Sequence, residues 1–79
     1  MALYFFHVRG GTFEAEDEEG VELANEAAAR DRARVGARSI IAAEILEGRL
    51  TLGERIDVAD AAGQLLFSLP FADAVERSA

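Results

Sequence analysis

The sequence R-I-D-V-A-D-A-A-G-Q-L-L-F-S-L-P at residues 55–70 predicts a β-hairpin, and this hairpin decides the fold. Ile56 and Val58 alternate with other residues in the period of two that is typical of a half-buried strand. The D-A-A-G at 60–63 has Asp first and Gly last, as a type I turn prefers. Residues 64–69 alternate again as the partner strand, with three apolar side chains on the inward face: Leu65, Phe67 and Leu69.

The N-terminal residues 3–9, L-Y-F-F-H-V-R, are aromatic and β-branched and predict another strand. Alternation directs Tyr4, Phe6 and Val8 toward the core. The outer face of the strand then carries Leu3, Phe5, His7 and Arg9. A Gly-Gly pair ends the strand, and residues 12–14 could pair back as a short second strand.

Residues 26–47 consist largely of good helix formers and predict a helix about 33 Å long. Asn25 is the expected N-cap and Gly48 the expected C-terminal stop. Small and apolar residues form a stripe that should pack on the sheet: Ala29, Ala33, Gly36, Ile40 and Ala43. Ile41 and Ile45 lie further round, so the apolar arc is wider than one sheet face needs.

The order strand, short strand, helix, strand, strand predicts an α+β fold. One long helix would pack on one face of a small antiparallel sheet of three to four strands, and a short helix could follow at residues 71–77. With 79 residues, the chain has room for a single domain that spans residues 1–79.

The chain is acidic, with 15 Asp and Glu residues against eight Arg and a formal net charge of −7. A negative field repels phosphate backbones and anionic lipids, so we expect neither nucleic acid nor a membrane as a partner. The charge favours either a basic protein partner or simply solubility. The absence of Cys excludes disulfides and fits a reducing compartment. Because no apolar run is long enough for a membrane helix, we expect the cytoplasm.

Several segments occur in an order that resembles a known family. They are Y-F-F at 4–6, D-E-E-G at 17–20, the Ala- and Arg-rich helix, and L-P-F at 69–71. In this order they are similar to small bacterial proteins grouped as domain of unknown function 6894. The resemblance covers residues 4–71 and implies a compact stand-alone domain without an assigned activity. Members often have an acidic residue where this chain has His7, so the resemblance gives that position no fixed chemical role.

Catalysis has little support in the sequence. His7 is the only histidine, and Asp57 is its expected neighbour across the sheet. An exposed polar pair is the favoured interpretation, and an enzyme that uses His7 as a base is the weakest hypothesis. No Ser lies in a nucleophile elbow, and without Lys no P-loop motif exists. We therefore expect no catalytic residue and no cofactor.

The acidic run E-A-E-D-E-E at 14–19 is the best metal candidate, because Ca²⁺ prefers clustered oxygen ligands. Its register does not fit an EF-hand, since position six would be Glu19 and position twelve Asn25 instead of Gly and Glu. We expect a solvated loop and no metal site. A cationic ridge on the helix could meet phosphates, but we expect it to pair with the chain's own acids or to be solvated: Arg30, Arg34 and Arg38.

Two apolar surfaces are candidates for an interface. One is the outer sheet face with Leu3, Phe5 and Leu66, and the other is the helix arc with Ile41 and Ile45. The favoured hypothesis is a non-catalytic protein-interaction module that self-associates, as a homodimer, through one of these surfaces. The alternative is an acidic regulator or inhibitor, similar to an antitoxin, that masks a basic partner.

Overall fold

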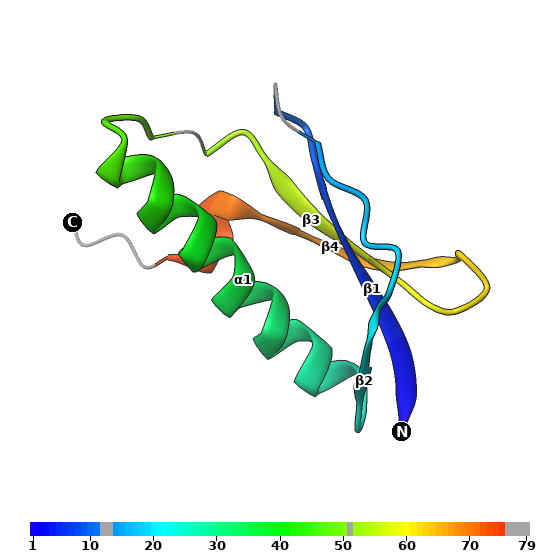
Figure 1. Ribbon diagram of the computed structural model, residues 1–79. Helices are drawn as coiled ribbons and strands as arrows, with labels where there is room; N and C mark the ends of the chain where they lie inside the picture. Colours follow the sequence, from blue (N-terminus) through cyan, green and yellow to red (C-terminus); the bar gives the residue numbers. More distant parts are fainter. Residues whose placement is uncertain (12–13, 51, 76–79) are drawn as a thin grey trace.

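The structure, a computed structural model, describes residues 1–11, 14–50 and 52–75. It contains an antiparallel sheet of four strands in the order β2-β1-β3-β4, with the long helix α1 across one face (Figure 1). The elements are β1 (Ala2–Arg9), β2 (Val21–Leu23), α1 (Glu26–Leu46), β3 (Arg55–Ala59), β4 (Leu65–Pro70) and a 3-10 turn, η1 (Phe71–Ala74). The predicted α+β class and order of elements are confirmed.

The hairpin of β3 and β4 follows its predicted turn chemistry. The Gly63 amide donates to the Asp60 carbonyl at 3.0 Å, and Asp60 Oδ1 accepts from the amides of Ala62 and Gln64. Gly63 has a φ of +82°, a conformation that residues with a Cβ rarely adopt. The turn projects away from α1 (Figure 1), so the predicted burial of Leu65 is wrong, and this side chain is 57% exposed.

The second strand lies later in the chain than the sequence predicts. Of the predicted residues 12–14, residues 12 and 13 lie outside the described part of the chain. The strand that pairs with β1 on the side opposite β3 is β2, in which Val21 pairs with Tyr4. Ala15 makes an isolated bridge to Val8 further along the same edge. The acidic run therefore follows the edge of β1.

Both ends of α1 are capped as the sequence predicts. The Asn25 side chain accepts a hydrogen bond from the Ala28 amide at 2.9 Å, which satisfies a donor of the first turn. At the other end Gly48 has a φ of +84° and donates its amide to the Ile45 carbonyl at 2.9 Å. The next amide bonds one residue further back, which completes a Schellman motif.

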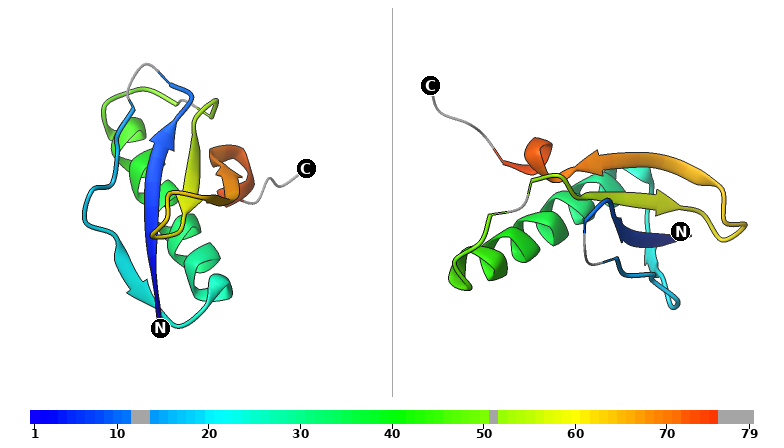
Figure 2. Two further views of the ribbon diagram at one scale, coloured as in Figure 1. Left: turned by 90° about the vertical axis from the view of Figure 1, so that its right-hand side faces the viewer. Right: turned by 90° about the horizontal axis from the view of Figure 1, so that it is seen from above.

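The core lies between α1 and the sheet, which form two layers (Figure 2). Its buried residues come from both layers and from η1: Tyr4, Ala29, Ala33, Ala37, Ile41, Ile56, Val58, Phe71 and Ala74. The buried stripe of the helix is rotated from the predicted one, because Ala37 and Ile41 are buried whereas Ala43 is exposed. Small side chains on this stripe let the helix backbone approach the strands closely.

The chain after β4 turns back toward the core through η1. Phe71 is fully buried, and its amide donates to the Glu54 carbonyl at 2.9 Å. η1 takes the place of the short helix predicted at residues 71–77, of which 76 and 77 lie outside the described residues. This turn joins the end of β4 to the start of β3.

Candidate functional site

The acidic run is fixed to β1 through Asp17. One Asp17 carboxylate oxygen accepts the Phe6 amide at 3.1 Å, and the other accepts the amides of Glu19 and Gly20. The Phe6 amide faces the gap between the β2 pairing and the bridge further along β1, so Asp17 satisfies a donor that the sheet leaves unpaired. Burial alone would raise the pKa of Asp17, but these three hydrogen bonds hold it below its ordinary value of 3.8.

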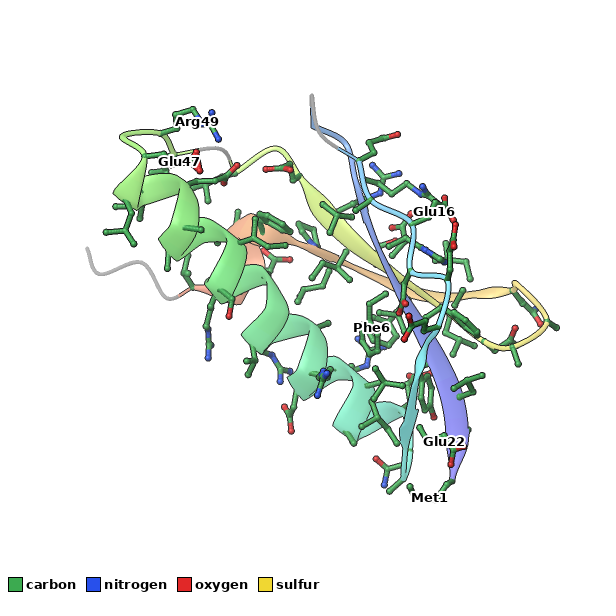
Figure 3. The ribbon with its side chains drawn as sticks, viewed as in Figure 1. Met1, Phe6, Glu16, Glu22, Glu47 and Arg49 are labelled. Carbon is green, nitrogen blue, oxygen red and sulfur yellow. The ribbon has the colours of Figure 1, made fainter. Side chains whose placement is uncertain are left out.

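The same loop contacts polar side chains of the outer sheet face. The Asp17 amide donates to His7 Nδ1 at 3.0 Å, so the neutral ring carries its proton on Nε2. Glu16, seen beside β1 in Figure 3, forms an ion pair with Arg9 and lies 3.5 Å from His7 Nδ1. The prediction of a solvated loop is right for the exposed glutamates and wrong for Asp17, which is half-buried.

His7 and Asp57 face each other across β1 and β3, as predicted. Asp57 accepts hydrogen bonds from Ser68 Oγ at 2.6 Å and from Arg55 Nε at 3.0 Å. Burial alone would raise the pKa of Asp57, but these bonds and the charges of Arg55 and Arg9 hold it below 3.8. The Ser68 hydroxyl donates its hydrogen bond to the Asp57 carboxylate and not to His7, so these side chains lack the serine-to-histidine contact of nucleophilic catalysis.

A shallow hollow of about 220 Å³ adjoins His7 at the hairpin end of the sheet. It is lined by Phe5, His7, Ala59, Asp60, Ala61 and Gly63. Asp60 is already bound to the turn amides. Among the lining residues, none is therefore placed to act as an acid or base together with His7.

The apolar candidates of the outer face are partly covered. Leu3 and Phe5 are half-buried because the acidic loop packs on them. A Cβ added to Gly20 would lie 3.0 Å from the Phe5 ring and 3.1 Å from Leu3. Leu66, the third candidate on this face, is 36% exposed. The exposed apolar area of this face is smaller than the alternation of β1 implies.

The two helix candidates have different environments. Ile41 is 6% exposed and packs in the core, so its predicted place on an exposed arc is wrong: it lies one turn after Ala37 on the buried stripe. Ile45 is 56% exposed, as predicted, and has exposed apolar neighbours that the sequence analysis did not identify as exposed. These residues are called the helix patch: Val35, Ala42, Ile45, Leu46 and Leu50.

The arginines of the cationic ridge on α1 bind groups of the same chain, and the predicted pairing with acids is present at Arg30 and Arg34. Arg30 bonds to Glu26 at 3.2 Å, and Arg34 forms an ion pair with Asp31. Arg38, the third member, donates to a main-chain carbonyl of η1. These contacts occupy the guanidinium groups with partners of the same chain.

A pair of glutamates that the sequence analysis missed joins the end of α1 to the start of β3. Glu54 is 3% exposed, and the half-buried Glu44 of α1 lies beside it. Each has one buried carboxyl oxygen without a hydrogen-bond partner among the described residues. Burial, and then the neighbouring Glu44 carboxyl, raise the pKa of Glu54 above its ordinary value of 4.5. Nothing local marks this pair, because a helix cap and a connecting segment separate its members.

Two further classes of site can be assessed within residues 1–11, 14–50 and 52–75. No group of three or more His, Asp or Glu side chains in these ranges is arranged to hold a metal ion. No helix in the same ranges combines the length and apolar character that crossing a membrane requires.

Fold and site together define a small two-layer α+β domain with an apolar helix surface and a structural acidic loop. Residues 3–72 match the family described as Domain of unknown function (DUF6894). Since the match spans most of the chain, the protein belongs to this family, as the order of its segments indicated. No curated protein and no solved structure matches the chain. A function therefore has to be argued from the surfaces themselves.

Proposed function

We propose that this chain is a non-catalytic interaction module of the bacterial cytoplasm that pairs with a second copy of itself through the helix patch. The main support is the exposure of large aliphatic side chains there, with Leu46 89% and Leu50 61% exposed. Val35, Ala42 and Leu46 are seven and four residues apart, so they share one side of α1. Burying such a surface is favourable because it removes apolar area from water.

The charge distribution favours a second copy at this surface. α1 carries four Arg against three acidic residues, a net charge of +1. The rest of the chain has a net charge of −8, and together they give the total of −7. Copies that meet helix to helix thus avoid the repulsion that would arise between their acidic surfaces. Because the same patch lies on both copies, the contact closes as a two-fold dimer, the commonest symmetry of soluble oligomers.

The size of the core also supports a partner. The molecule measures 37 × 27 × 17 Å, and Val58 and Phe71 are its largest fully buried side chains. With no Cys in the sequence, disulfides cannot add stability. Domains this small often gain the missing burial from another subunit.

The test is the molar mass of variants with a charge in the patch. We expect the wild-type chain to have the mass of two 8.5 kDa chains in gel filtration with light scattering, and Ile45→Asp/Leu46→Asp to have the mass of one. Leu65→Asp is the matched control, because Leu65 is 57% exposed on the hairpin, outside the patch, and this variant should stay dimeric. A monomeric wild type, or a folded double variant that remains dimeric, would contradict the proposal.

A second candidate function, an acidic regulator that masks a basic protein, has one observation in its favour. Glu18, Glu19 and Glu22 are exposed and take part in none of the ion pairs within the described residues. Affinity capture from the source cells should then yield one stoichiometric basic partner that is lost at high salt. Changing all three residues to Gln should abolish its capture at low salt, and a partner that binds the variant equally well would exclude this function.

A further inference from the structure

The Glu44–Glu54 pair has no role in the proposed dimerisation, and its geometry is unusual for two like charges. We propose that Glu44 and Glu54 form a proton-operated clasp, which ties the end of α1 to the start of β3 while the two carboxyls share one proton and loosens when that proton leaves. The clasp acts within one chain and does not depend on the proposed dimer.

Glu54 is held in place from several directions. Its carbonyl accepts the Phe71 amide at 2.9 Å, which anchors its backbone to η1. Its side chain packs on Gly11, where an added Cβ would lie only 2.6 Å from the Glu54 Cγ. With 3% of its surface exposed, Glu54 is almost completely shielded from solvent.

A shared proton gives the pair the hydrogen-bond donor that two ionised carboxylates lack. Two ionised carboxylates can only accept hydrogen bonds, and each glutamate has a buried oxygen that finds no donor among the described residues. When one carboxyl is protonated, its O–H can donate to the other, and the pair carries one negative charge instead of two. Loss of that proton leaves two like charges in a desolvated site, which repel each other.

The cations near the Glu44–Glu54 pair do not neutralise its second negative charge, so a proton is needed to do so. Arg49, in the connection after α1, is the cation that lowers the pKa of Glu54, but its effect is smaller than those of burial and Glu44. Arg49 is itself 3.4 Å from Glu47 (Figure 3). Arg55, next in the chain, bonds to Asp57 on the outer face. In the segment that follows β1 the neighbour is the uncharged Gly11, and Asp73 of η1 is exposed.

The direction of the pH effect follows from the raised pKa of Glu54. In the unfolded chain Glu54 has its ordinary pKa of 4.5, and in the folded chain its pKa is higher. The stability contributed by the proton is complete below pH 4.5 and is lost as the pH rises through the folded value. The clasp is therefore closed below pH 4.5 and loosens as the pH rises through the folded pKa of Glu54. Since Ile45 and Leu46 follow Glu44 directly, opening also disturbs the helix patch, and this consequence alone depends on the proposed function.

The test compares urea unfolding of the wild type and Glu54→Gln from about pH 4 to pH 8 at one protein concentration, with a chelator present so that protons are the only cations that bind. We expect the ratio of the wild-type to the variant unfolding constant to rise with pH between 4.5 and the folded pKa of Glu54, by up to about tenfold per pH unit. In this range the folded wild type holds the shared proton and releases it on unfolding, whereas Glu54→Gln has no such proton to release. Glu44→Gln should reduce this dependence, because it removes the neighbouring carboxylate but leaves the burial that also raises the pKa of Glu54.

The matched control is Glu47→Gln, which neutralises an exposed glutamate at the same end of α1 and should leave the ratio to wild type constant with pH. The second measurement is a carbon NMR titration of the Glu54 carboxyl in the wild-type chain, which needs no variant to fold. A midpoint above 4.5 supports the clasp. A midpoint at or below 4.5, or a ratio for Glu54→Gln that does not change with pH, would overturn it.

Discussion

The outer sheet face and the helix patch both carry apolar side chains, but the described chain covers only one of them. On the outer face the acidic loop packs on Leu3 and Phe5, and Gly20 is in close contact with both. On the helix, Leu46 remains 89% exposed. A loop rich in charges can therefore cover an apolar strand when one of its carboxylates, here that of Asp17, is bound to the backbone of that strand.

The largest expected effect comes from removing this bond. Asp17→Ala leaves the Phe6 amide without its acceptor and releases the turn at Glu19 and Gly20. Because a partly buried donor without a partner is costly and two further hydrogen bonds of the loop are lost with it, we expect a loss of about 3 kcal/mol in the free energy of unfolding. Urea denaturation measures it, and Glu18→Ala is the control, since Glu18 is exposed in the same loop. Equal stability of the two variants would mean that Asp17 does not hold the loop.

Acid should act on the same bond. The pKa of Asp17 is below 3.8 in the folded chain, so its stabilising effect is present above pH 3.8 and is lost as the pH falls through the folded value. This is opposite in sign to Glu54. We expect wild type to lose stability in acid more steeply than Asp17→Ala does, and parallel pH profiles of the two proteins would argue against the assignment.

The next effect separates loop packing from backbone strain. Gly20 has a φ of +74° and Gly48 a φ of +84°, but only Gly20 has side chains against it. Gly48→Ala should cost about 1 kcal/mol from the left-handed conformation alone. Gly20→Ala should cost about 1–2 kcal/mol more, because its Cβ also meets the Phe5 ring. Similar losses in thermal or urea unfolding would show that the loop does not pack on Phe5.

The smallest effect on the fold is expected in the helix patch. Leu46→Ser removes a side chain that touches little within its own chain, so the stability of the dilute monomer should change by less than about 0.5 kcal/mol. The same change should weaken dimerisation, which sedimentation equilibrium measures over a range of concentrations. A large loss of monomer stability would show that Leu46 belongs to the core.

The sequence predicted what local chemistry determines. The turn at residues 60–63, the Asn25 cap and the Gly48 stop each rest on contacts within a few residues, and each is present. The rotation of α1 was harder to predict, because Ala occurs on its buried face at Ala37 and on its exposed face at Ala42. Without large side chains on one side, the helical period does not indicate the buried stripe.

The features that the sequence did not predict depend on contacts between residues that are far apart in the chain. In the sequence, Asp17 is one of five acidic residues in the acidic run. It fixes the loop only because β1 has an amide at Phe6 that the sheet leaves unpaired. Glu44 and Glu54 belong to different elements, and only the packing of α1 beside β3 brings their carboxyls together. Charge patterns along a sequence do not reveal which acid is buried.

The most direct test of the account is an amide NMR comparison of the wild-type chain at low and high concentration, with the resonances assigned. We predict concentration-dependent shifts at Val35, Ala42, Ile45, Leu46 and Leu50, and none at Leu3, Phe5 or Leu66, because the proposed dimer buries the helix patch and leaves the outer sheet face free. Shifts confined to the outer sheet face, or spectra that do not change with concentration, would contradict the account.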